Sequence, residues 1–208
     1  NVTIGLHPAR YTRLSGLEEG KIRHDINKAV AKYREELGAE PKYFSYPFGE
    51  YSELYKKIIQ EQSFAAALTQ MSGKAYIGSD LYDLPRFTMT VNYDTIERFR
   101  MTANALPFPV RDIHPNDPQL NAPLQSIGFT LPYGIAQNAE RLSCFVSDIG
   151  RVPYEIIGEK RVEIRLDAPI NNRRIRMNCT LPVKQPDDPD KTRWRWLGFL
   201  FIAAPDEE

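Results

Sequence analysis

The chain has few cysteines, few histidines and no excess of charge of either sign. Two of its 208 residues are Cys and three are His, while Lys+Arg and Asp+Glu balance at 27 each. This balance argues against a broad basic surface for nucleic acid. No stretch of the sequence approaches the apolar length that spans a bilayer. We therefore predict a globular protein with no nucleic-acid partner and no membrane span.

The two cysteines, Cys144 and Cys179, lie far apart and outside any Cys-x-x-Cys spacing. Their spacing gives no support for a cysteine zinc site or a thioredoxin-type motif. Two alternatives stay open, a structural disulfide between neighbouring strands and two buried free thiols, and we favour the disulfide. A disulfide would place the protein in an oxidising compartment, so we expect it to be secreted, periplasmic or on the cell surface.

The first half of the chain alternates between strand and helix patterns. We expect parallel strands joined by helical crossovers, because apolar runs of strand length are separated by amphipathic stretches. Ser15 with Glu18 predicts a capping box for the first helix, and Gly38 predicts its end. Asp94 with Glu97 predicts a second capping box. The expected strands are residues 2–6, 42–46, 65–68 and a strand end at 83–87; the expected helices are 15–37, 53–62 and one beginning near 94.

The second half of the chain changes to a period of two. Prolines punctuate residues 107–123, which predicts a linker over 111–124 between a first domain, 1–110, and a second, 125–208. Trp194 and Trp196 share one face of a strand, either as core or as an outward carbohydrate platform, and we favour core. Six strands are expected, at 126–131, 141–147, 152–157, 161–166, 174–181 and 193–202, and they suggest a small antiparallel β-sandwich.

The run from Tyr46 to Tyr51, Tyr-Pro-Phe-Gly-Glu-Tyr, is the most informative stretch of the sequence. It follows an expected strand, so it would place backbone N–H groups and aromatic rings at the carboxyl end of that strand, where α/β folds keep their active sites. Tyr46, Phe48 and Tyr51 would either stack on the apolar faces of sugar rings or pack in the core beneath the loop.

Three segments in order resemble the later half of the catalytic domain of polysaccharide deacetylases, the NodB-homology family (carbohydrate esterase family 4). Val2–His7 is similar to the strand that carries the family's His-x-x-x-His metal motif. Tyr46–Tyr51 is similar to the Pro-Tyr-Gly loop that forms one wall of its groove. Leu84–Phe87 is similar to a later strand end whose arginine orients the catalytic aspartate. The resemblance covers residues 1–110 and implies part of a distorted (β/α) barrel.

The resemblance also implies roles for individual residues. It makes His7 a ligand of Zn²⁺ or a similar divalent cation, whereas Tyr11 stands where the second metal histidine is expected. It makes Phe48 and Arg86 catalytic, with the Phe48 backbone N–H available to an oxyanion. Tyr46, Pro47 and Tyr51 would bind substrate. Without the resemblance, His7 is a strand-end histidine bonded to backbone, and Arg86 pairs with Asp83 at the surface.

The sequence thus predicts an α/β plus all-β chain, the later part of a metal-dependent hydrolase that removes N-acetyl groups from an extracellular or cell-wall polysaccharide. Its expected partners are that N-acetylated polysaccharide and the N-terminal half of the barrel, as a separate or cleaved chain. The alternative is a catalytically inactive deacetylase-like protein that binds polysaccharide or a partner protein; Tyr11 favours this alternative.

Overall fold

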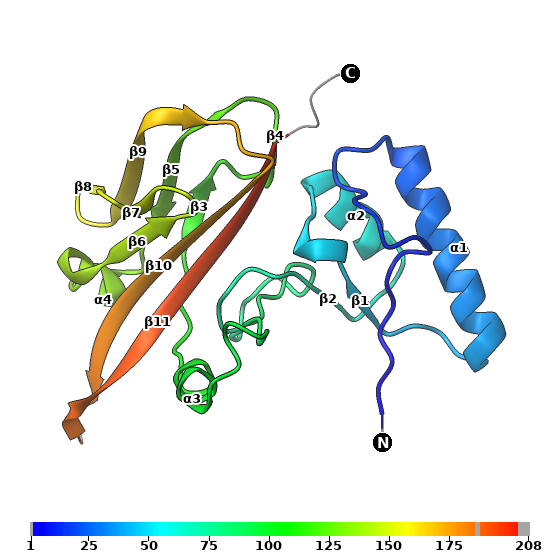
Figure 1. The fold of residues 1–208 in the computed structure, drawn as a ribbon, viewed down its shortest axis with the longest axis horizontal. Coiled ribbons are helices and arrows are strands. Elements are labelled where there is room, and N and C mark those ends of the chain that lie inside the picture. The colour runs from blue at the N-terminus through cyan, green and yellow to red at the C-terminus, as the bar shows by residue number, and fades with distance from the viewer. Residues whose placement is uncertain (1, 186–187, 204–208) are drawn as a thin grey trace.

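The computed structural model describes residues 2–185 and 188–203 and shows two units side by side (Figure 1). The first unit carries helices α1 and α2 on a small parallel sheet, and the second is built from two larger sheets. Within the described ranges, no helix is both long and apolar enough to cross a membrane.

The first unit is held together by the apolar faces of its two helices. It consists of α1 (Glu19–Leu37), β1 (Tyr43–Ser45), a 3₁₀ turn (Pro47–Gly49), α2 (Glu53–Glu61) and β2 (Ala66–Leu68). Ile22 and Ile26 of α1 are fully buried, as the spacing of four predicts. Gly38 ends α1 in the left-handed conformation, as predicted. The Ser15 capping box is wrong: α1 begins four residues later, because Gly16 turns the chain with a positive φ of 83°.

The parallel sheet of the first unit is wider than its two strands. β1 and β2 pair in parallel, and single parallel bridges join Leu6 to Phe44 and Leu68 to Leu84. Four parallel segments therefore lie side by side, so that the residues after each of them meet at one edge of the sheet. The strand expected over residues 2–6 is reduced to the bridge at Leu6.

Helix α3 (Ile96–Ala103) connects the two units and buries little of its surface. Its N-cap is Thr95, whose hydroxyl accepts a hydrogen bond from the Arg98 N–H at 3.2 Å, so the expected cap at Asp94 is wrong by one residue. Ile96 and Phe99 are each 60% exposed. Although Ile96 and Phe99 recur at helical spacing, they do not form a buried face of α3 among the described residues.

The second unit contains two sheets whose facing sides share one apolar cluster. One sheet has the order β4-β11-β10-β6-β7 and the other β3-β5-β9-β8. The segment expected as a linker contributes β3 and β4, and the strand expected over 152–157 is two strands, β7 and β8. The elements are β3 (Arg111–His114), β4 (Gln119–Leu120), β5 (Leu124–Thr130), α4 (Tyr133–Ala136), a 3₁₀ turn (Ala139–Arg141), β6 (Ser143–Val146), β7 (Gly150–Val152), β8 (Glu155–Ile157), β9 (Arg161–Ile170), β10 (Arg174–Gln185) and β11 (Asp188–Ala203).

The disulfide is confirmed. Cys144 on β6 lies directly opposite Cys179 on β10, and the two are bonded in the middle of the apolar cluster. Both side chains are fully buried. The bond therefore links two neighbouring strands of one sheet rather than the two sheets.

Strand β11 has one face in each unit. Leu197, Phe199 and Phe201 point into the cluster between the sheets, and the alternation of a strand turns Trp196 to the other side. There its ring meets that of Phe87 edge-on, with the centroids 5.5 Å apart. The predicted core position of this tryptophan between the sheets is therefore wrong, because its face of β11 is covered by the first unit.

Backbone contacts tie β11 to the first unit as well. Gly73 forms an antiparallel bridge with Leu197, and Leu106 a parallel bridge with Arg195. A Cβ atom on Gly198 would lie 2.5 Å from the Ser72 carbonyl oxygen, so only glycine permits this approach. The last described strand thus belongs structurally to both units.

Candidate functional site

The Tyr46–Tyr51 loop leaves the carboxyl end of β1 and turns back over the parallel sheet. Tyr46 and Tyr51 are 0% and 6% exposed, and the Tyr46 hydroxyl donates to the Tyr82 carbonyl oxygen at 2.9 Å. Burial raises the pKa of both tyrosines well above the usual value. Pro47 is buried too. The structure therefore places these three residues beneath the loop, where they support it as core packing does.

Phe48 is the loop residue that reaches the surface, and its backbone is unusual. Its φ is +57°, a left-handed conformation that costs a non-glycine residue about 1 kcal/mol or more. The Phe48 ring packs against Tyr11, with the centroids 4.9 Å apart, and beneath the Arg13 guanidinium at 4.4 Å. Gly49 follows with φ +72°, and a Cβ there would collide with the Gln70 backbone. Neighbouring segments thus fix the turn from both sides.

A buried carboxylate binds this turn to the second unit. Glu50 is 2% exposed, and its Oε2 accepts a hydrogen bond from Arg13 Nε at 3.0 Å. Arg174, from β10, places Nε 3.6 Å from Glu50 Oε1, an ion pair that is too long for a hydrogen bond. Its Nη2 donates to the Phe48 carbonyl oxygen at 2.5 Å. One arginine of the second unit therefore holds both the carbonyl and the charge of the loop.

His7 and Arg86 lie at the same end of the sheet. His7 is exposed, contacts the ring of Tyr11 at 5.4 Å, and hydrogen-bonds to the Ser45 backbone. Burial of part of its ring lowers the pKa of His7; the Ser45 bond opposes this shift and the Arg86 charge adds to it. Arg86 donates from Nε to the Thr69 carbonyl at 2.7 Å and from Nη2 to Ser45 Oγ at 3.4 Å. His7, Phe48 and Arg86 thus form one cluster around the ends of the parallel segments.

The surface pairing of Arg86 with Asp83 does not occur. Asp83 accepts hydrogen bonds from Tyr51 and Lys56 instead, at 3.3 and 3.4 Å. Within the described ranges, Arg86 has no carboxylate partner. Its guanidinium is held by backbone and hydroxyl oxygens, which leaves its charge uncompensated at the end of the sheet.

Comparison with known proteins gives a match for the segment that carries most of this cluster. Residues 1–67 match the polysaccharide deacetylase family. The matched segment contains His7, Tyr11 and the whole Tyr46–Tyr51 loop, so the resemblance found in the sequence is confirmed there, whereas Arg86 lies beyond it.

Two solved deacetylase structures are similar to the chain. One is the Streptococcus pyogenes deacetylase PplD in complex with acetate, with 18% identity, a TM-score of 0.43 and coverage of 46% of this chain and 42% of that one. The other is a de-N-acetylase from Aggregatibacter actinomycetemcomitans, with 12% identity, a TM-score of 0.32 and coverage of 39% and 31%. The chain therefore spans less than half of either deacetylase. No curated protein matches its sequence.

The deacetylase-matching cluster does not by itself fit Zn²⁺. Zinc sites use Cys, His or carboxylate ligands, three or four together. The described residues contain no group of three such side chains. His7 instead has the Tyr11 ring and the Arg86 charge beside it, and a guanidinium repels a cation.

Sequence reasoning missed the arginines that fix the loop. Arg174 lies 126 residues from Phe48, so no local pattern connects the two. Glu50 carried a signal, because a carboxylate inside an aromatic turn must be either solvated or paired. Its partners, Arg13 and Arg174, come from segments whose placement depends on the tertiary fold.

Proposed function

We propose that the chain is the later part of a deacetylase that removes N-acetyl groups from an extracellular or cell-wall polysaccharide. The observation that carries the proposal is the cluster of His7, Phe48 and Arg86 at one end of four parallel segments, two of these residues lying in the segment that matches the deacetylase family. The proposal includes the architecture: residues 1–110 as part of a distorted (β/α) barrel and residues 125–208 as a β-sandwich.

In this proposal each member of the cluster has a distinct task. The hydrogen bonds of the turn use the N–H groups of Gly49 and Glu50 and the Phe48 carbonyl, and within the described residues none uses the Phe48 N–H. That N–H would stabilise the oxyanion that forms when an acetamide carbonyl is attacked. Arg86, held by Thr69 and Ser45, would orient an acidic group or the developing charge.

The proposed cofactor is Zn²⁺ or a similar divalent cation, with His7 as one ligand. The lowered pKa of His7 supports this role, because a metal ligand must be a neutral imidazole. The remaining ligands would come from the N-terminal half of the barrel, as a separate or cleaved chain. The disulfide supports a secreted, periplasmic or cell-surface location, since such bonds persist in oxidising compartments.

One residue, Tyr11, favours a second function, that of a binding protein rather than an enzyme. Tyr11 stands where the resemblance expects the second metal histidine, and its ring lies between His7 and Phe48. An aromatic ring there suits the apolar face of a sugar rather than a cation. On this alternative the protein binds polysaccharide or a partner protein without cleaving it.

One experiment separates the two functions. The protein, together with its N-terminal portion, is analysed for bound metal and for acetate release from chitin oligomers. The hydrolase predicts stoichiometric zinc and acetate release, both lost in His7→Ala and both kept in the matched control His24→Ala, which removes an exposed histidine of α1. Absence of zinc and of acetate release, with glycan binding intact, would overturn the hydrolase and support the binding protein.

A further inference from the structure

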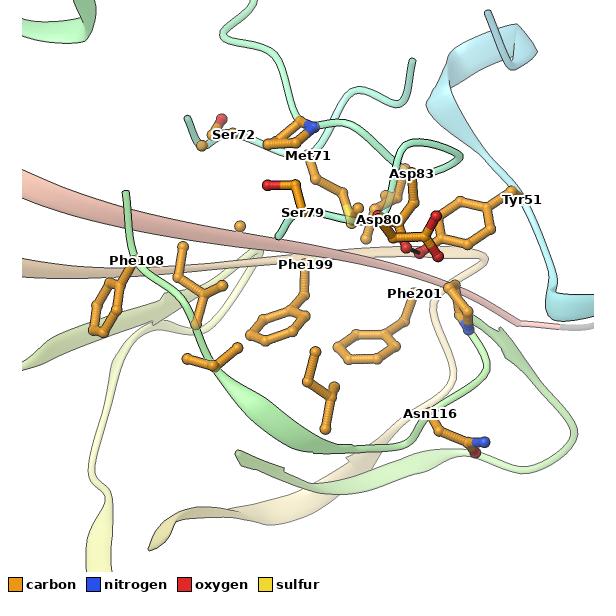
Figure 2. Close-up of a pocket in the computed structure, with 18 of the residues that line it drawn as sticks. Tyr51, Met71, Ser72, Ser79, Asp80, Asp83, Phe108, Asn116, Phe199 and Phe201 are labelled. Atoms are coloured by element: carbon orange, nitrogen blue, oxygen red, sulfur yellow. Dashed lines mark hydrogen bonds between the residues drawn. The ribbon is translucent and has the colours of Figure 1, made fainter. Parts of the chain in front are cut away.

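A cavity of about 520 Å³ lies between the two units, beside the edge of β11 that faces away from β10. Figure 2 shows Phe108, Phe199 and Phe201 on one side of this strand and Tyr51, Asp80 and Asp83 on the other. The exposed Tyr76 and the half-exposed Asp80 belong to its rim, so solvent reaches it. Concave sites of this size, mostly apolar with a few converging polar groups, are typical of small-molecule binding between domains.

The lining of the cavity carries an excess of negative charge. Four carboxylates line it, those of Glu53, Asp80, Asp83 and Asp112, against the two lysines Lys56 and Lys74; four minus two leaves an excess of two negative charges.

Lys56 is the cation shared by three of these carboxylates. Its Nζ lies 2.8 Å from Glu53, 3.3 Å from Asp80 and 3.4 Å from Asp83. Burial alone would lower the pKa of Lys56, but the hydrogen bond with Glu53 and the charges of all three carboxylates outweigh it and raise that pKa to about 12. Burial raises the pKa of Asp83. The charge of Lys56 opposes this shift, and repulsion from Asp80 adds to it. One lysine therefore does not neutralise the three carboxylates, and a second cation would reduce the remaining excess of negative charge.

The edge of β11 that faces away from β10 supplies backbone hydrogen-bonding groups to the same cavity. The Trp194 carbonyl accepts from Leu106 N–H, and the Ile202 N–H donates to the Pro118 carbonyl, both on this edge. Because a strand directs the N–H and C=O of alternate residues to the same side, those of Leu200 point there as well. Leu200 lies between the two pairings and lines the cavity. Its donor and acceptor suit the hydroxyl groups of a sugar.

We propose that this cavity binds a de-N-acetylated amino sugar, with the ammonium group against the carboxylates of Asp80 and Asp83, next to Lys56. The C–H face of the sugar ring would lie on the aromatic wall that includes Trp196, and its hydroxyls would bond the Leu200 backbone. The identity of the ligand rests on the proposed function, because this amine is what remains when an acetamide loses acetate. The cavity lies apart from the His7 and Arg86 cluster, neither of which lines it.

The test is calorimetric titration of the full chain with glucosamine oligomers and with the matched N-acetylglucosamine oligomers. The cationic oligomer should bind at least about tenfold more tightly than the acetylated one, the value of one charge-assisted hydrogen bond. Asp80→Asn should weaken its binding by a similar factor, and so should raised salt. Glu36→Gln is the matched control, because it removes an exposed carboxylate that pairs with a lysine on α1, and it should change nothing.

Three results would overturn the proposal: equal affinity for the two oligomers, no binding of the cationic oligomer, or binding that Asp80→Asn leaves intact. Asp83→Asn provides a second variant, with circular dichroism checking that each variant is folded. Acetate release is measured separately. Selective binding of the cationic oligomer without acetate release would support this cavity assignment and refute the proposed deacetylase activity. Acetate release without such binding would support the deacetylase activity and refute the cavity assignment.

Discussion

Arg174→Met is the sharpest test of how the second unit supports the deacetylase-like loop. The substitution keeps the length and apolar stem of the side chain but removes the guanidinium. Two interactions disappear: the hydrogen bond to the Phe48 carbonyl and the ion pair with Glu50 at 3.6 Å. Among the described residues, only Arg13 then remains paired with the Glu50 carboxylate, whose side chain is 1% exposed.

The expected loss follows from these two contacts. A hydrogen bond from a charged donor contributes about 1.5–3 kcal/mol. The ion pair adds at most about 1 kcal/mol, because the guanidinium is a quarter exposed and the contact is long. The free energy of unfolding should therefore fall by about 1.5–4 kcal/mol. Arg176→Met, an exposed arginine two residues along β10, is the matched control and should change it by less than about 0.5 kcal/mol.

Urea denaturation followed by tryptophan fluorescence measures this difference, and amide hydrogen exchange locates it. The Gly49 N–H, which donates to the Tyr46 carbonyl at 2.9 Å, should exchange faster in Arg174→Met because the turn has lost its outer support. Equal stabilities for Arg174→Met and the wild type, or an equal loss in Arg176→Met, would refute the reasoning.

Three further predictions follow from the same structure. The NMR-measured pKa of His7 should lie below 6.5, and it should rise in Arg86→Gln because a neighbouring positive charge is removed. Because the pKa of His7 is lower in the folded than in the unfolded protein, the stability that His7 contributes is present above pH 6.5. That stability is lost as the pH falls through the folded pKa. Gly49→Ala should lower the melting temperature by several degrees, since φ +72° and the adjacent backbone both exclude a Cβ. Reduction of Cys144–Cys179 should cost about 3–4 kcal/mol in urea titrations, from the entropy of a loop with a separation of 35 residues; an unchanged midpoint would contradict it.

Local pattern predicted much of the fold. The apolar spacing of Ile22 and Ile26 predicted α1, and strict alternation predicted β9 and β10, because each signal lies within one element. Alternation also placed Trp194 and Trp196 on one face, but which unit covers that face depends on pairing with distant segments. The sequence of the short strand β4 has no periodic pattern of apolar residues from which it could be predicted.

The candidate site also has a part that the sequence predicts and a part that it does not. A single stretch of sequence contains the Tyr46–Tyr51 loop, so its position after a strand was predictable. The support of that loop was not, because Arg174 comes from another unit. The cavity beside β11 was equally hidden, since its carboxylates, Glu53, Asp80, Asp83 and Asp112, lie far in the sequence from the Trp196 ring and the strand edge of β11.

The double role of β11 has a consequence for how the protein is made. Synthesis proceeds from the N-terminus, so β11 leaves the ribosome after every other described element. Until then the first unit lacks the strand that covers Gly73 and Phe87, and the second unit lacks Phe199 and Phe201 of its core. A nascent chain therefore exposes two incomplete apolar surfaces at once, and a chaperone that shields such surfaces would act on both units together.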